Sequence, residues 1–272
     1  MEALDPWDFT CLLPVHAGDN AAHFVLALES VAMGTLAPTV IMICQDGDLP
    51  ADLAAIVADG MQRFGAQVAR NPGSKGLHHN LNHAAGLVET PWLCRADADD
   101  LNAPDRFAAQ VDYLREHPQI DVLGGAIAEF WPSGASREKP LPTDHADILR
   151  WARYRSPINH MTAFIRVAAF RAAGGYPDLP RKEDYGLWIK LIAHGRQFAN
   201  LPRVLVRARL GDDFYDRRAG TRNLATEWRL LQMRRAVPGL GGLHAWVAFA
   251  ARSAALALRW PAEVIYERIL RR

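Results

Sequence analysis

The chain has 272 residues, of which 50% are hydrophobic and 22% charged, and its formal net charge is +1. This composition excludes a wholly disordered chain and supplies the core of one large α/β domain or of two small domains. The charge is uneven, because residues 203–272 hold 14 arginines, no lysine and 6 acidic residues, whereas the rest of the chain has an acidic excess. Such a basic tail suggests contact with phosphates or with an anionic membrane surface, although a solvated helical face would look the same.

Strands and amphipathic helices alternate over residues 10–100. Apolar runs predict strands at Thr10–His16, Thr39–Gln45, Gln67–Arg70 and Pro91–Arg95. Apolar residues at helical spacing predict helices over 19–33, with Asp19 as the N-cap, over 52–64 and over 77–88. This alternation predicts a mostly parallel sheet that is covered by helices on both faces.

The pattern becomes more mixed after residue 100. It predicts a helix at Pro104–His117, a strand at Asp121–Trp131, a loop at Ser133–Thr143, strands at Asn159–Arg166 and Phe198–Arg209, and between these two a helix that starts near Glu183. A mixed sheet is therefore expected.

The three cysteines, Cys11, Cys44 and Cys94, lie in apolar strand-like runs and form no close pair. We interpret them as small buried residues in a reducing compartment, and their spacing does not favour a zinc site. The first ten residues are acidic and lack the apolar core of a signal peptide. No run of about 20 uninterrupted apolar residues predicts a membrane span. A cytoplasmic location is therefore expected.

An acidic run, Asp97-Ala98-Asp99-Asp100, follows an apolar strand. Carboxylates this close raise one another's pKa, and a divalent cation such as Mg²⁺ or Mn²⁺ would relieve the repulsion. A cation that also bridged a diphosphate would neutralise the charge of a leaving group. The alternative is a solvated turn, in which Asp100 caps the helix that begins near Pro104.

A second acidic pair, Glu183-Asp184, precedes an apolar helical pattern. Acidic residues in the first turn of a helix complement its dipole, so simple capping is one interpretation. The functional interpretation is a general base that takes a proton from an acceptor hydroxyl.

Other polar residues follow predicted strand ends or starts. Asp46 and Arg70 lie where a ligand would bind beyond the sheet, and they are candidates for contacts with a base or ribose or are ordinary surface residues. Asn159 and His160 follow Pro157, either facing the site or forming a structural hydrogen-bonding pair.

Several segments together resemble family 2 glycosyltransferases of the GT-A fold, especially the branch that includes the amylovoran-type exopolysaccharide glycosyltransferases. The resemblance runs from about Thr10 to Arg218. It is carried by the segments LLPVH, CQDG, NPGSKGLHHNLNHA, RADADDLNAPDRFAAQV, SPINHMTAFIR, AAGGYPDLPRKEDYGLWIKL and FANLPRVLVRARLG. It implies an α/β fold of GT-A type, Rossmann-like, with a mixed, mostly parallel sheet flanked by helices, and a C-terminal helical appendage. We expect a nucleotide-sugar transferase domain over 1–215 and a basic, amphipathic helical region over 216–272.

The resemblance also implies an activity and roles for individual residues. The expected reaction is inverting transfer of a sugar from a nucleotide-diphosphate donor to an acceptor hydroxyl, with Mn²⁺ or Mg²⁺ near Asp97 and Asp99 in the DxD role. Asp184 resembles the catalytic base, with Glu183 supporting it. Further residues resemble donor contacts, namely Pro14, Val15, Asp46 and Arg70. The acceptor or diphosphate side is expected to include Asn159, His160, Arg217 and Arg218.

The expected partners are a UDP- or dTDP-type sugar and a glycan or lipid-linked acceptor, with no nucleic acid. The segment Leu243–Trp260 is apolar but interrupted by Arg252 and Arg259, which are seven residues apart and share a helical face. This segment either lies on the inner face of the membrane or packs on the protein. Two rival functions stay open: a non-catalytic nucleotide-sugar-binding or scaffold protein, and a Mg²⁺-dependent phosphotransferase or nucleotidyltransferase.

Overall fold

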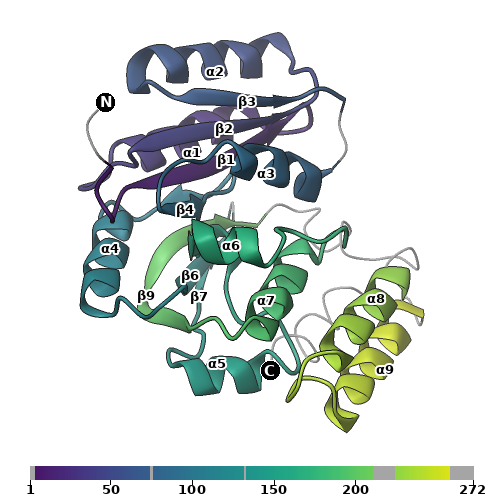
Figure 1. The fold of residues 1–272 in the computed structure, drawn as a ribbon. Coiled ribbons are helices and arrows are strands. Elements are labelled where there is room, and N and C mark those ends of the chain that lie inside the picture. The colour runs from purple at the N-terminus through teal and green to yellow at the C-terminus, as the bar shows by residue number, and fades with distance from the viewer. Residues whose placement is uncertain (1–3, 74–75, 132, 211–223, 258–272) are drawn as a thin grey trace.

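The computed structural model describes residues 4–73, 76–131, 133–210 and 224–257 (Figure 1). Within these residues, nine strands form one sheet in the order β3-β2-β1-β4-β8-β6-β9-β5, and β7 pairs with β6 at the side of this path. The sheet is mixed and helices lie along it, which confirms the predicted fold class.

The first half of the sheet is parallel. Its strands are β1 (Phe9–His16), β2 (Val40–Asp46), β3 (Gln67–Asn71) and β4 (Trp92–Arg95). They are connected by α1 (Ala21–Ala32), α2 (Ala51–Phe64) and α3 (Leu77–Gly86). These elements match the predicted ranges. The predicted cap of α1 was wrong: Asn20 is the N-cap and accepts from the His23 backbone N–H at 3.0 Å, whereas Asp19 accepts from the His16 backbone N–H.

The second half of the sheet is mixed in direction. Its strands are β5 (Leu101–Asn102), β6 (Val122–Phe130), β7 (Ser136–Lys139), β8 (Phe164–Arg166) and β9 (Phe198–Arg209). Strand β8 is antiparallel to β4 and to β6, whereas β6 and β9 are parallel. The predicted loop over 133–143 contains β7, and only the last three residues of the predicted strand at Asn159–Arg166 are a strand. The preceding residues form a 3₁₀ turn, His160–Thr162, which the Thr162 hydroxyl stabilises by donating to the Asn159 carbonyl.

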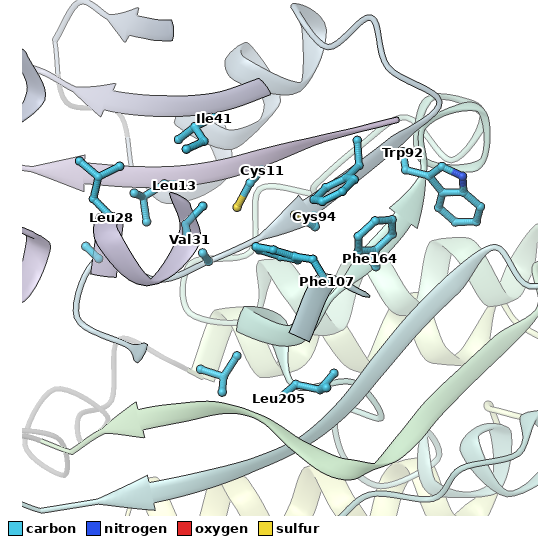
Figure 2. Packing of buried hydrophobic residues seen from close by; sticks show 14 of the residues in the cluster. Cys11, Leu13, Leu28, Val31, Ile41, Trp92, Cys94, Phe107, Phe164 and Leu205 are labelled. Carbon is cyan, nitrogen blue, oxygen red and sulfur yellow. The ribbon is translucent and has the colours of Figure 1, made fainter. Parts of the chain in front are cut away.

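Four helices complete the α/β body in the described residues: α4 (Arg106–Glu116), α5 (His145–Trp151), α6 (Val167–Ala172) and α7 (Glu183–Ala193). Side chains that alternate along β1 pack on opposite sides of the sheet, with Leu13 against α1 and Leu12 against α3. Aromatic rings close the core between the two halves, since Phe9 lies 5.2 Å from Phe107 and 4.9 Å from Phe164 between ring centroids. Figure 2 shows Phe107 and Phe164 beside Cys94 in this core.

Close contact between β6 and β9 depends on glycine. A Cβ on Gly125 would lie 2.4 Å from Leu205 Cδ1, so a larger residue there would collide with the core side of β9. The β6–β9 register shifts next to this residue, between Gly125 and Ala126. The three cysteines are all buried and unpaired by disulfides, as the sequence predicts.

The described part of the C-terminal region consists of α8 (Leu224–Arg235) and α9 (Leu243–Ala257), which lie side by side next to α7 (Figure 1). Leu230 of α8 packs in one cluster with Tyr185 and Ile189 of α7. Buried Glu227 makes ion pairs with Lys182 (3.5 Å) and Arg252 (3.4 Å). Arg252 therefore points toward the protein body. No helix in the described ranges is both long and apolar enough to span a bilayer.

Candidate functional site

A cavity of about 400 Å³ lies beyond the carboxyl ends of the first strands. Its lining comes from the segments that follow β1, β2 and β3, namely His16, Ala17, Gly18, Asp46, Gly47, Asp48 and Gly73. Gly47 and Gly73 both have a φ of +78°, a conformation that glycine adopts without steric cost. A cavity of this volume falls in the range of small-molecule sites, and its position is the usual ligand position in parallel α/β sheets.

Two of the predicted nucleoside contacts differ in their relation to this cavity. Asp46 is buried, lines the cavity and accepts a hydrogen bond from Asn71 Nδ2 at 3.3 Å. Arg70 is exposed and pairs with Asp48 at 2.5 Å, so it reaches the cavity wall through Asp48. The Asp46 carboxylate is thus fixed by the sheet, whereas Arg70 pairs with another surface residue.

Pro14 and Val15 are buried in β1 opposite Cys44 and Gln45, directly before the cavity-lining residue His16. His16 was not singled out in the sequence. Its Nδ1 lies 3.1 Å from Asp19 Oδ2, and the hydrogen bond to Asp19 raises the pKa of His16. A half-exposed imidazole that gains a proton easily is suited to contact an anionic ligand.

The acidic run after β4 divides into two kinds of carboxylate. Asp97 and Asp99 are partly exposed, whereas Ala98 and Asp100 are buried. Asp100 accepts from the Arg209 backbone N–H at 2.8 Å, and burial, followed by the charges of Asp97 and Asp99, raises its pKa well above the ordinary value. The expectation that Asp100 might only cap the next helix was wrong, because α4 begins at Arg106 with Asp105 as its N-cap.

Arg95 lies beneath this run and was missed in the sequence. It is buried, and its Nη2 lies 2.6 Å from Asp97 Oδ1. Its carbonyl accepts from Arg106 Nη2 at 2.7 Å. The one signal for it in the sequence is a charged residue at the end of the apolar strand Pro91–Arg95. The buried guanidinium holds the Asp97 carboxylate in one orientation and offsets part of its charge.

We asked whether the carboxylates of this site fit the ligand requirements of a divalent cation. In the part of the chain that the structure describes, no three His, Cys, Asp or Glu side chains converge as metal ligands. Two partly exposed carboxylates, Asp97 and Asp99, do stand together after β4. Mg²⁺ commonly takes one or two protein carboxylates and completes its octahedron with substrate phosphates and water. The residues present therefore fit a cation that binds together with a diphosphate.

The second acidic pair opens α7. Glu183 is buried and Asp184 is partly exposed. Burial, followed by the charge of Asp184, raises the pKa of Glu183 to about 7. The Ser156 hydroxyl donates to Asp184 Oδ2 at 3.2 Å. Arg181, just before the helix, has a φ of +65°, a strained conformation for a residue with a side chain.

The two acidic segments belong to one electrostatic site. Among the smaller influences on the Glu183 carboxyl, Arg95 lowers its pKa and Asp97 raises it. The same Arg95 contributes, after burial, to lowering the pKa of His160 well below its ordinary value. Backbone geometry links the two segments: the Arg95 N–H donates to the Ala163 carbonyl at 3.0 Å, and Ser156, earlier in the same connecting segment, donates to Asp184.

Asn159 and His160 form the wall between these segments. Asn159 is buried, and its Nδ2 donates to the Gly125 carbonyl at 2.9 Å. His160 Nε2 lies 2.9 Å from the Tyr176 hydroxyl, and its ring packs edge-on against Tyr176 and Trp188. These contacts favour a structural role for both residues. Arg217 and Arg218 lie outside the described residues.

Known proteins of similar fold give the class. S. aureus TarS 1–349 in complex with UDP-GlcNAc matches with a TM-score of 0.67 and 15% identity over 96% of this chain and 76% of that chain. The chain spans 46% of the longer TarS chain. Mannosyltransferase PcManGT from Pyrobaculum calidifontis, in complex with GDP-Man and Mn²⁺, matches with a TM-score of 0.61 and 17% identity over 97% and 81%. The fold is that of the GT-A glycosyltransferases.

Sequence comparison gives the family. Residues 20–173 match glycosyl transferase family 2. An uncharacterized glycosyltransferase of Haemophilus influenzae is 33% identical over 90% of this chain and 91% of its own length. Amylovoran biosynthesis glycosyltransferase AmsE of Erwinia amylovora is 29% identical over 90% and 92%. An Escherichia coli UDP-Gal:alpha-D-GlcNAc-diphosphoundecaprenol beta-1,3-galactosyltransferase is 27% identical over 80% of each chain. The chain belongs to glycosyl transferase family 2, as its motifs predict, and its activity is glycosyl transfer.

Proposed function

We propose that this protein transfers a sugar from a nucleotide-diphosphate donor to an acceptor hydroxyl with inversion at the anomeric carbon. The observation that supports this most is that two acidic segments, Asp97–Asp99 and Glu183–Asp184, are linked through residues 156–163, while a cavity of about 400 Å³ lies beyond the ends of β1, β2 and β3. A transferase needs one place for the leaving diphosphate and another for the proton of the acceptor, and the two segments can divide these tasks.

The donor would occupy the side of the site built by the first strands. The nucleoside enters the cavity near Asp46 and His16, and the diphosphate points toward Asp97 and Asp99. Asp99, with Asp97 held by Arg95, would hold Mn²⁺ or Mg²⁺. When bound, this cation neutralises the negative charge that develops on the departing diphosphate. UDP or dTDP is the proposed nucleotide, and two relatives of this fold or family have names that include UDP sugars.

Asp184 acts from the acceptor side. Its carboxylate takes the proton from the acceptor hydroxyl as the oxygen bonds to the anomeric carbon and the bond to the diphosphate breaks. Attack from the face opposite the leaving group inverts the configuration, as in base-assisted inverting glycosidases. Ser156 orients the Asp184 carboxylate, and Glu183 supports it from the buried side of the helix start. Arg217 and Arg218 remain proposed contacts of the diphosphate or acceptor.

The acceptor is proposed to be a growing glycan or a lipid-linked sugar in polysaccharide synthesis. This rests on the names of two relatives, one of amylovoran biosynthesis and one that acts on a diphosphoundecaprenol-linked sugar. A cytoplasmic site of action with peripheral contact to the inner membrane follows from the same proposal, and the surface that makes this contact is argued below.

Product analysis tests the proposal against its rivals. The purified protein is incubated with a panel of UDP- and dTDP-sugars, Mn²⁺ and a lipid extract that contains glycan acceptors. A glycosyltransferase releases the nucleoside diphosphate, whereas transfer of the nucleotidyl group from the same donor would release the sugar 1-phosphate. Binding of a nucleotide sugar without release of either product would support a non-catalytic binding protein and would contradict the proposal.

A further inference from the structure

The exposed side of α9 is apolar. Leu243, Trp246 and Val247 are 80%, 41% and 57% exposed, and Ala250 and Ala254 continue the same helical stripe. Trp228 of α8, 42% exposed, lies beside them, with ring centroids 6.1 Å from Trp246 and 5.7 Å from Phe249. We call the set Trp228, Leu243, Trp246, Val247 and Phe249 the aromatic face. Large apolar residues gathered at the surface mark an interaction site more often than single ones do.

In an ordinary surface helix the apolar side faces the protein and the charged side faces water. In α9 these two sides are exchanged. Its charged residue, Arg252, is buried, pairs with Glu227 at 3.4 Å and donates to the Tyr154 carbonyl. The aromatic face points away from this ion pair. A helix whose outer side met water would normally carry charged residues there and apolar residues inward. The arrangement therefore indicates that the medium on the outer side is not water alone.

The charged side chains that α8 and α9 themselves expose are of one sign. Glu227 is the single acidic residue in 224–257, and it is buried. Among the described residues of α8 and α9, the charged side chains that reach the surface are Arg229 and Arg235. The Arg235 guanidinium lies 5.2 Å from the Trp246 ring, and Arg229 lies 3.9 Å from Asp178 at the edge of α8. Aromatic residues with arginine beside them are typical of surfaces that bind at the headgroup level of an anionic bilayer.

We infer that the aromatic face docks on an anionic lipid bilayer. The tryptophans enter the interface between headgroups and acyl chains, and Arg229 and Arg235 bind the lipid phosphates. This inference rests on the proposed function for the nature of the acceptor. Helix α8 packs on α7, and Lys182, next to the Glu183–Asp184 pair, forms an ion pair with Glu227 of α8. Docking would hold the base-bearing helix next to the surface where a lipid-linked acceptor lies.

Co-sedimentation of the full chain with vesicles tests the inference without any donor or turnover. Vesicles of phosphatidylglycerol and phosphatidylcholine in equal amounts should bind the protein, and phosphatidylcholine vesicles should bind it at least about tenfold more weakly. The triple variant Leu243→Ser/Trp246→Ser/Val247→Ser should lose about tenfold or more of the affinity for anionic vesicles. The matched control, Met61→Ser/Leu87→Ser, removes exposed apolar residues from the opposite half of the protein and should bind as the wild type does.

A labelled variant keeps the test valid if the triple variant folds poorly. The three native cysteines are buried, so Val247→Cys places the accessible thiol on the aromatic face. A polarity-sensitive fluorophore on this thiol should shift to shorter wavelength with anionic vesicles, and the same label on Met61→Cys should not. Equal shifts at both positions, or none at either, would overturn the inference. The inference would also be overturned if the wild type did not bind vesicles but sedimented as a dimer without lipid, and if the triple variant abolished this dimer. That result would assign the face to a second copy of the chain.

Because binding is measured without sugar donor, the inference and the proposed function fail separately. Vesicle binding with no nucleoside diphosphate release would remove the transferase proposal and leave the docking surface in place. Release of the nucleoside diphosphate without vesicle binding would do the reverse.

Discussion

The two acidic segments of the site are built in opposite ways. Asp97 and Asp99 follow a buried strand, and the buried guanidinium of Arg95 offsets Asp97 from below at 2.6 Å. Glu183 and Asp184 open a helix, where the backbone dipole and the Ser156 hydroxyl face the carboxylates. In the first segment a fixed positive charge lies against one of two partly exposed carboxylates. The second includes a carboxyl whose pKa of about 7 lets it change protonation near neutral pH. This contrast agrees with the proposal that the first segment binds the cation and the diphosphate and that the second takes up the proton of the acceptor.

The largest expected effect comes from removing the proton acceptor. Asp184→Asn keeps the shape and the contact with Ser156 but cannot take the proton, so turnover should fall by roughly 10²–10⁴-fold while donor binding is retained. Nucleoside diphosphate release and calorimetric titration measure the two properties. Asp178→Asn, an exposed aspartate of the same segment, is the matched control. Turnover within a few-fold of wild type in Asp184→Asn would remove Asp184 from the role of base.

The pH dependence of stability tests the environment of Glu183. Its pKa is about 7 in the folded protein against an ordinary value of 4.5, so the folded state binds the extra proton between these values. The free energy of unfolding should therefore fall as pH rises from about 4.5 to just above about 7, by up to about 3 kcal/mol. Urea unfolding of Glu183→Gln should lack this part of the fall, because glutamine does not titrate. The same pH dependence of stability in both proteins would show that the pKa of Glu183 is not raised by folding.

The smallest effect is expected at the third carboxylate of the first segment. Asp100 is buried, its pKa is raised, and it accepts from the Arg209 backbone N–H, which an asparagine oxygen can also do. Asp100→Asn should therefore leave nucleotide affinity within about threefold of wild type, a change of less than 1 kcal/mol. Isothermal titration of this variant with the nucleotide tests whether Asp100 has a structural role while Asp97 and Asp99 bind the ligand. A loss as large as that of Asp99→Ala would place Asp100 at the ligand.

The first half of the fold, from β1 to β4, could be predicted from the sequence because its strands are continuous apolar runs and its helices have a clear apolar stripe. Helices α5 and α6 could not, since they have seven and six residues, too few for a period to be recognised. Strand β7 (SREK) is polar and largely exposed, so its pairing with β6 leaves no pattern in the residues. The predicted strand at 159–163 is a turn because the Thr162 hydroxyl bonds Asn159, a contact that propensity does not register.

The sequence proposes site residues where the residue type itself carries the chemistry, and their roles stay predictions. Asp97, Asp99, Glu183 and Asp184 follow that rule, and the fold brings their segments together. Arg95 and His16 matter through their contacts with Asp97 and Asp19, which spacing does not reveal. The tail shows the same limit. The spacing of Arg252 and Arg259 predicts a shared helical face that meets either the membrane or the protein, and the structure buries Arg252 against Glu227, which leaves the aromatic face outward.

The most direct test of the central claim is calorimetric titration of the wild type with UDP, dTDP and GDP, with Mn²⁺ and with chelator. The account predicts that one nucleotide binds in the presence of Mn²⁺, that chelator weakens it, and that Asp99→Ala reduces its affinity by about 10- to 100-fold. Asp112→Ala, an exposed aspartate on α4, should bind as the wild type does. Absence of nucleotide binding with Mn²⁺ present, or binding that Asp99→Ala leaves unchanged, would contradict the assignment of the donor site.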